Sequence, residues 1–186
     1  AKLESGKVDL MGGIFAAASL YTGSFGSTNI WTQTATVNFG QSFTARPIAL
    51  KGFYKYTSNV INLVKNVPAG VTIVKDQTLD QCAIYIALAK KTYTIDNGNQ
   101  STFIDFKNDE NIIAYGELPS GAATEGDGYV EFNIPLKYKN LTDQPTHIIV
   151  VCSSSKYGDY MTGGAGSTLY VDDLSLIYDG TPTIWE

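Results

Sequence analysis

A segment with charged, aromatic and hydroxyl side chains lies between two apolar runs in the last quarter of the chain. Residues 153–168 read SSSKYGDYMTGGAGST. A saccharide presents hydroxyl edges and apolar C–H faces, so a sugar site needs flat aromatic rings beside carboxylate, amide and ammonium groups. Four side chains here supply that mixture: Lys156, Tyr157, Asp159 and Tyr160. A ligand-binding loop and a loop whose tyrosines merely pack on the edge of the protein are both compatible with this composition.

Two further parts of the chain extend the predicted ligand site. In residues 82–88, small alanine side chains surround Tyr85 on one face of an alternating pattern, which suits a surface that a ligand approaches closely. Residues 51–56 carry Lys55, whose ammonium group can donate charge-assisted hydrogen bonds to a sugar. We therefore expect one site built from the 153–168 loop, the 51–56 strand and the Tyr85 face.

Carboxylates offer an alternative to binding alone. Hydrolysis of a glycosidic bond needs two carboxyl groups about 5–10 Å apart, depending on the mechanism. The acidic candidates are Asp105, Glu117, Glu131, Asp159, Asp172 and Asp173. If the protein is a glycoside hydrolase, Glu117 and Asp172 are the pair that we would test first. The binding hypothesis assigns no catalytic residue.

Other reaction classes find no support in the motifs. His147 is the one histidine, and it opens an apolar strand after Pro145, which is typical of a structural strand end. No HExxH zinc motif is present. The GGAGS stretch at 163–167 lacks the GK[ST] tail of a phosphate-binding loop, so it reads as a tight connection in which glycine allows positive φ.

Asp172 is the candidate metal ligand. Strict alternation in 169–178 places Asp172 on the same face as Leu174 and Leu176, which we expect to be the core side. A carboxylate near an apolar core must be compensated by hydrogen bonds, a cation or a metal. Calcium, completed by carbonyl oxygens of the glycine-rich N-terminal segment, is one solution, and a salt bridge or hydrogen-bonded turn is the other. No further cofactor is required.

Composition excludes several classes of protein. The chain has 186 residues, with 13 lysines and arginines against 18 acidic residues, giving a formal charge of −5. Because no basic cluster is present, we expect no nucleic-acid partner. The most apolar stretch, 148–152, is strand-sized, so no transmembrane segment is expected. Cys82 and Cys152 lie in apolar strands, either as buried free thiols or as one disulfide bridge.

The elements that must position these residues are strands. Period-two alternation and turn residues predict strands at 36–39, 47–56, 82–88, 129–138, 148–152 and 169–178. No apolar pattern of helical period reaches helical length. The sequence therefore predicts a single all-β, antiparallel sandwich or barrel.

Several of these stretches together resemble a known family. They are PTHIIVVCSSSKYGDYMTGGAGSTLYVDDLSLIYD (145–179), SLYTGSF (19–25), FTARPIALKGFYKY (43–56) and IIAYGEL (112–118). The chain is identified from them as similar to the putative carbohydrate metabolism domain, over about residues 19–179. We therefore expect one domain at 19–186, with residues 1–18 as an N-terminal segment or linker that packs on it.

The resemblance implies a fold, a ligand and a location. The implied fold is a two-sheet jelly-roll, like galactose-binding and carbohydrate-binding modules, in some of which an aspartate in the place of Asp172 helps to hold calcium. The implied role is non-catalytic glycan binding within an exported protein of the periplasm or cell surface, lipid-anchored as a precursor and carrying additional domains. A glycoside hydrolase and a protein-binding adhesin module are the alternatives.

Overall fold

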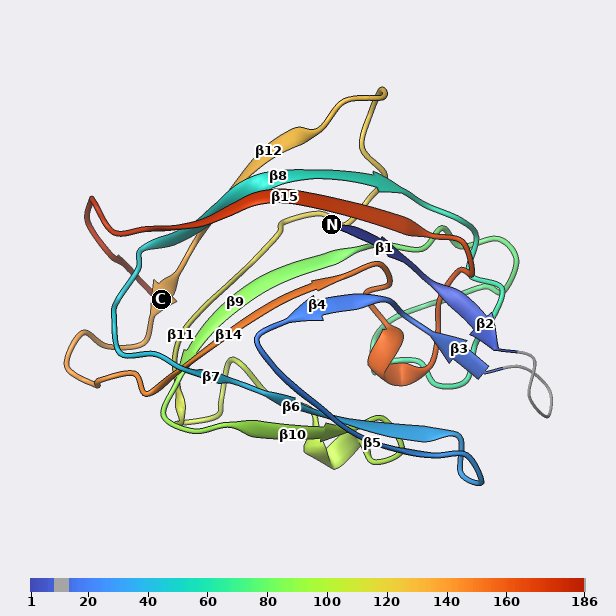
Figure 1. The fold of residues 1–186 in the computed structure, drawn as a ribbon, viewed down its shortest axis with the longest axis horizontal. Coiled ribbons are helices and arrows are strands. Elements are labelled where there is room, and N and C mark those ends of the chain that lie inside the picture. The colour runs from blue at the N-terminus through green and yellow to red at the C-terminus, as the bar shows by residue number, and fades with distance from the viewer. Residues whose placement is uncertain (9–13, 186) are drawn as a thin grey trace.

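Two β-sheets face each other across the main hydrophobic core and form a jelly-roll sandwich (Figure 1). The computed structural model describes residues 1–8 and 14–185. The four-stranded sheet consists, in spatial order, of β1 (Lys2–Glu4), β15 (Thr168–Ile177), β8 (Ala49–Thr57) and β12 (Val130–Pro135). All its neighbours are antiparallel. The predicted two-sheet antiparallel sandwich is confirmed.

The opposing sheet has seven strands. In spatial order they are β16 (Thr183–Ile184), β13 (Lys137–Tyr138), β11 (Ile112–Glu117), β9 (Ala83–Ala89), β14 (His147–Ser153) and β4 (Ser19–Tyr21), with β7 (Gln41–Ser42) also paired to β14. The short β13–β16 pair is parallel, and the other pairs are antiparallel.

The core between the two sheets follows the alternation of the strands. Ile84, Ile86 and Leu88 of β9 are buried, as their common face predicts, and Leu50 and Tyr56 of β8 meet them from the other sheet. The Tyr56 hydroxyl donates a 3.0 Å hydrogen bond to the carbonyl of Ser154, so burial leaves this polar group satisfied.

The predicted strand 129–138 divides between the two sheets. Phe132 and Ile134 lie in β12 and pack into the core from the four-stranded sheet, whereas Tyr138 lies in β13 of the seven-stranded sheet. Leu136, which is fully buried, occupies the crossing point between them. One run of alternating residues therefore closes one end of the sandwich.

A third layer covers the outer face of the seven-stranded sheet (Figure 1). It is a three-stranded sheet of β10 (Tyr93–Asp96), β6 (Thr34–Phe39) and β5 (Gly23–Asn29). A second apolar cluster fills the space beneath it, including Phe39, Ile95, Ile149 and Val151. This layer was not expected from the sequence, and it creates an additional internal surface on the far side of the sandwich.

The described part of residues 1–18 is built into these layers. β1 pairs with β15 in the register Leu3 with Leu169, and Ser5 is buried. β2 (Gly6–Val8) and β3 (Ile14–Ala16) form a separate two-stranded ribbon beside the third layer (Figure 1). The start of the chain thus lends an edge strand to the four-stranded sheet.

The prediction that Asp172 faces the core is wrong. Leu169 and Val171 are the buried residues of this part of β15, and Asp172 is exposed on the outer face. A β-bulge between Asp172 and Ser175, with Asp173 at φ 49°, shifts the alternation by one residue. Leu176 therefore faces the core, whereas Asp172, on the other side of the bulge, faces outward. Asp172 accepts a 3.0 Å hydrogen bond from the Asp173 N–H.

The two cysteines are free and buried in the core. Among the described residues, helix is limited to two short 3₁₀ turns, η1 (Gln100–Thr102) and η2 (Gly158–Tyr160). In that part of the chain, no helix is long and apolar enough to span a membrane.

Candidate functional site

A cavity of about 660 Å³ opens between the third layer and the beginning of the chain. Its walls come from β2, β3, β4, β5, β6 and β10, from Ser153 at the end of β14, and from Gly158 and Asp159 in the loop that follows. The first 39 residues and the 153–168 loop, which are far apart in sequence, therefore meet at this cavity. Protein cavities that hold a small ligand commonly measure about 300–1,000 Å³.

Aromatic and aliphatic side chains form most of the wall. In β6, Ala35, Val37 and Phe39 point into the cavity, because alternation sends every second residue to this side of the sheet. Tyr21 packs edge-to-face on Phe39, with ring centroids 5.3 Å apart. Phe25 of β5 stands at the rim with 61% of its surface exposed. A planar apolar surface is thus open to solvent.

Uncharged polar side chains interrupt the apolar wall. They include Ser19, Thr28, Asn29, Gln33 and Asn97. The side-chain Oδ1 of Asn97 accepts a 2.8 Å hydrogen bond from the backbone N–H of Ala35, which fixes this side-chain amide at the wall. Amides and hydroxyls of this kind both donate and accept hydrogen bonds, as sugar hydroxyls do.

Asp159 is the single acidic or basic side chain among the described residues that line the cavity. It lies on η2 and is exposed to solvent, and the protein packed around its carboxyl group nevertheless raises the pKa of that group above the usual value. Burial raises the pKa of Tyr85 well above its usual value, and the charge of Asp159 raises it further.

A buried network holds the loop that carries Asp159. The carboxylate of Asp80, which is 1% exposed, accepts hydrogen bonds from the Ser155 hydroxyl at 2.5 Å and the Gly164 N–H at 2.8 Å. Ser5 joins from the N-terminal segment, with its hydroxyl 2.7 Å from that of Ser155. Gly164 fits because a Cβ there would lie 2.7 Å from the carbonyl oxygen of Val60. The loop is therefore fixed from both ends.

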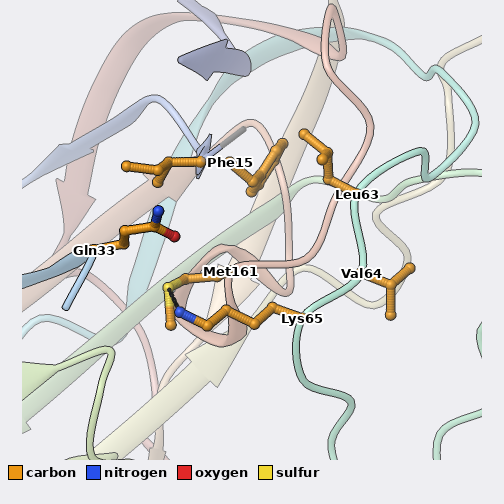
Figure 2. A pocket seen from close by; sticks show the side chains of 7 residues that line it. Phe15, Gln33, Leu63, Val64, Lys65 and Met161 are labelled. Atoms are coloured by element: carbon orange, nitrogen blue, oxygen red, sulfur yellow. Dashed lines mark hydrogen bonds between the residues drawn. The ribbon is translucent and has the colours of Figure 1, made fainter. Parts of the chain in front are cut away.

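A second hollow of about 240 Å³ adjoins the first. The two share Ile14, Phe15 and Gln33 in their walls. Figure 2 shows the Lys65 ammonium against the Met161 sulfur, at 3.5 Å. Because thioether sulfur is a weak acceptor, this contact leaves the ammonium able to bind a further group.

The three tyrosines of the expected site, which are Tyr85, Tyr157 and Tyr160, lie outside the cavity lining. Tyr160 packs edge-to-face on Phe103 at 5.0 Å, and Tyr85 on Phe106 at 5.3 Å. Tyr157 is half-buried at the start of η2. Lys156 is exposed, and its N–H donates to the Gln81 carbonyl at 2.6 Å. Of the predicted ligand residues, the structure places Asp159 in the wall.

Lys55 lies on the opposite side of the molecule from Tyr85. Its neighbour Tyr56 points into the main core, so alternation directs Lys55 outward from the four-stranded sheet. There its ammonium donates a 3.0 Å hydrogen bond to the Asp127 carbonyl. Tyr85 faces the third layer from the other sheet. The structure therefore does not bring the 51–56 strand together with the rest of the expected site.

The two acids proposed for the enzyme alternative are also apart. Glu117 shares the third-layer face of β11 with Tyr115, whereas Asp172 points outward from the four-stranded sheet. Packed sheets lie about 10 Å apart, and these side chains extend away from each other. Glu117 and Asp172 consequently do not face one cleft.

Comparison with known proteins identifies the family. A family model described as "Putative carbohydrate metabolism domain" matches residues 1–177. The chain belongs to this family. The match begins at residue 1, so it takes in the segment that the sequence resemblance had left out. No match was found among curated proteins.

Two solved structures from Bacteroides species share the fold of this carbohydrate metabolism domain. One is described as a putative glycoside hydrolase from Bacteroides vulgatus, with a TM-score of 0.66 and 25% identity over 95% of this chain and 71% of that chain. The other is described as a putative glycoside hydrolase from Bacteroides thetaiotaomicron, with a TM-score of 0.58 and 20% identity over 96% of this chain. This chain spans 57% of the second protein, whose likeness shows the fold alone.

Sequence reasoning missed most of the cavity wall of the domain. Phe25, Val37 and Phe39 were not named as site residues, because residues 1–33 show no sustained period and 36–39 read as an ordinary strand. A usable signal was nevertheless present. Tyr21 and Phe25 belong to SLYTGSF, one of the stretches that carried the family resemblance.

Proposed function

We propose that this domain binds a glycan non-catalytically in the cavity between the third layer and the 153–168 loop. The observation that carries the proposal is the combination of an open apolar and aromatic wall with uncharged polar side chains and one carboxylate. Membership of a carbohydrate metabolism family supports a saccharide as the ligand.

The chemistry of the wall suits a sugar ring. The exposed face of Phe25 can pack on apolar C–H groups, and the side chains of Asn29 and Asn97 can bond hydroxyl groups. The carboxylate of Asp159 can accept hydrogen bonds from hydroxyl donors, and such charge-assisted bonds are stronger than neutral ones. With few such contacts, the affinity for one saccharide unit is expected to be weak.

Hydrolysis is the less favoured role for this cavity. It requires two carboxyl groups, and the described lining offers only Asp159. The domain should therefore release no reducing ends from a glycan that it binds. A measurable release that disappears in Asp159→Asn would instead establish an enzyme.

A protein partner is a second candidate, because the hairpin between β5 and β6 exposes large apolar side chains. Ile30 is 66% exposed and Trp31 is 84% exposed, and Ile30 also lines the cavity. Exposed apolar residues of this kind are found in protein interfaces. A glycan array discriminates the two roles, since a protein-binding module would bind no glycan.

The direct test is to fill the cavity. Ala35→Trp places an indole in the wall, whereas Ala123→Trp places the same group on an exposed loop as a matched control. We expect the wild type and Ala123→Trp to bind the same set of glycans on an array, and Ala35→Trp to bind none of them. Equal binding by all three proteins would place the site elsewhere.

We further propose that the domain acts outside the cytoplasm, in the periplasm or at the cell surface, as part of a larger chain. The support is the family resemblance and the Bacteroides source of the similar structures. Protease treatment of intact cells followed by immunoblotting tests this location. Full protection together with recovery in the cytoplasmic fraction would contradict it.

A further inference from the structure

Among its described residues, the cavity wall carries one carboxylate and no basic side chain. The described lining contains no lysine, arginine or histidine, and Asp159 is its single carboxylic acid. Lys65, the nearest basic side chain of the adjoining hollow, lies outside this lining and contacts Met161. Any charged group on a ligand inside the cavity would therefore meet a carboxylate and no cation from the wall.

Asp159 also lacks a protein partner. Within residues 1–8 and 14–185, its carboxylate makes no hydrogen bond or ion pair, whereas the buried Asp80 accepts three hydrogen bonds from the protein. Because Asp159 is exposed at the cavity and no protein group donates to it, its oxygens are open to donors from a bound ligand. Two neighbouring hydroxyl groups of a sugar can supply them, one to each oxygen.

A negatively charged sugar would have the opposite effect. A uronic acid carboxylate or a sulfate group in the cavity would stand close to Asp159, and the bound ligand would displace water that otherwise screens the two charges. Like charges brought together at a binding interface weaken affinity strongly when no cation separates them. The wall offers no compensating cation among its described residues.

Resting on the function proposed above, we propose that the cavity selects uncharged saccharides and that Asp159 determines this selectivity. Its carboxylate accepts hydrogen bonds from adjacent hydroxyl groups of the bound unit and repels uronic acid and sulfated units. The ligand class is thereby narrowed to neutral glycans, or to the neutral segments of mixed glycans.

The test uses matched pairs of oligosaccharides that differ only in charge. Each neutral hexose oligomer that binds on an array is compared, by titration in solution, with the same oligomer carrying a hexuronic acid or a sulfate. We expect the wild type to favour the neutral member at least tenfold. In Asp159→Asn, we expect this preference to fall below about threefold and the affinity for the neutral member to drop about tenfold.

A second variant controls for the loss of one negative charge from the protein. Asp179→Asn lies just beyond the end of β15, whose other end, at Thr168, is nine residues and about 30 Å away beside the cavity loop. This variant should behave as the wild type, and unchanged melting temperatures would show that both variants fold.

The outcomes separate the inference from the function on which it rests. If the wild type binds neutral and acidic members equally, prefers the acidic member, or keeps its preference in Asp159→Asn, the selectivity role is overturned while glycan binding stands. If the wild type binds no saccharide at all, the proposed function itself falls, and the selectivity role falls with it.

Discussion

The Asp80 carboxylate accepts a 2.5 Å hydrogen bond from the hydroxyl of Ser155, 75 positions further along the chain. Both groups are buried, and the same carboxylate also bonds the Gly164 N–H. This contact anchors the 153–168 loop to the segment before β9, and thereby fixes the part of the cavity wall that carries Asp159. The stability of the domain and the shape of the candidate site consequently depend on one buried group.

Replacing Asp80 by asparagine should therefore destabilise the fold. Asparagine keeps one acceptor oxygen, whereas the carboxylate uses both of its oxygens, so at least one buried donor loses its partner. We expect a loss of about 1–3 kcal/mol in the free energy of unfolding, measured by urea denaturation. Asp76→Asn, at an exposed position with φ 61° that asparagine tolerates, is the control and should change stability little.

The same substitution has a predictable pH dependence. Burial raises the pKa of Asp80 above the ordinary 3.8, although hydrogen bonds from Ser155 and Gly164 act against the shift. A raised pKa means that the folded state holds the proton more tightly, so this contribution to stability decreases as the pH rises from about 3.8 through the folded-state pKa. The destabilisation by Asp80→Asn should accordingly shrink with rising pH. A destabilisation that grows over this range would contradict the assignment.

The two thiols should be inert in the folded protein. Burial raises the pKa of both Cys82 and Cys152 to about 12, so almost no thiolate is present at neutral pH. We expect no reaction with a thiol reagent under native conditions and two reactive thiols per chain in denaturant. Because the folded state favours the neutral thiols, they contribute fully to stability below the unfolded-state pKa of about 9. This contribution is lost as the pH rises toward 12. Fast reaction of the native protein would show that these positions open.

Shortening Phe25 should separate binding from stability. Its ring is largely exposed at the cavity rim, so Phe25→Ala removes little buried surface and should leave the melting temperature nearly unchanged. Loss of one aromatic contact is expected to weaken glycan binding about 3- to 10-fold. Tyr129→Ala, at an exposed ring near β12, is the matched control and should bind as the wild type does. Equal affinities for both variants would remove Phe25 from the site.

Calcium at Asp172 is now expected to be unnecessary for folding. A core-facing carboxylate would need a compensating cation, whereas Asp172 is exposed to solvent. Within the described ranges, no group of three or more histidine, cysteine, aspartate and glutamate side chains could hold a metal. A chelator should therefore leave the melting temperature unchanged, and added calcium should not raise it. A rise of several degrees with calcium, lost in Asp172→Asn, would restore the metal site.

The layers of the sandwich were predictable because alternation is a local property. Ile84, Ile86 and Leu88 lie on one face of their strand in any sheet, and burial of that face follows from the side chains alone. Alternation predicted the wrong face for Asp172 because a bulge between Asp172 and Ser175 adds one residue to the strand. The residue types at this point do not indicate a bulge.

The candidate site was less predictable than the fold, because it depends on which strands lie beside each other. The 153–168 loop was singled out from its residue types, and Asp159 does line the cavity. Lys55 was grouped with it although β8 and β9 belong to different sheets. The alternation of residues along one strand does not show which strands are its neighbours. The third layer escaped detection because β5 is exposed along its whole length and carries no alternating apolar pattern.

A glycan that occupies the cavity between the third layer and the 153–168 loop should change the signals of the residues that line it. The most direct measurement is an NMR titration of the ¹⁵N-labelled domain with the tightest-binding neutral oligosaccharide, following backbone amide signals. We expect the signals that shift to belong to cavity residues, including Ala35, Val37, Asn97 and Asp159, and those around Lys55 to stay in place. Shifts confined to the outer face of the four-stranded sheet, or no shift with any saccharide, would contradict this expectation.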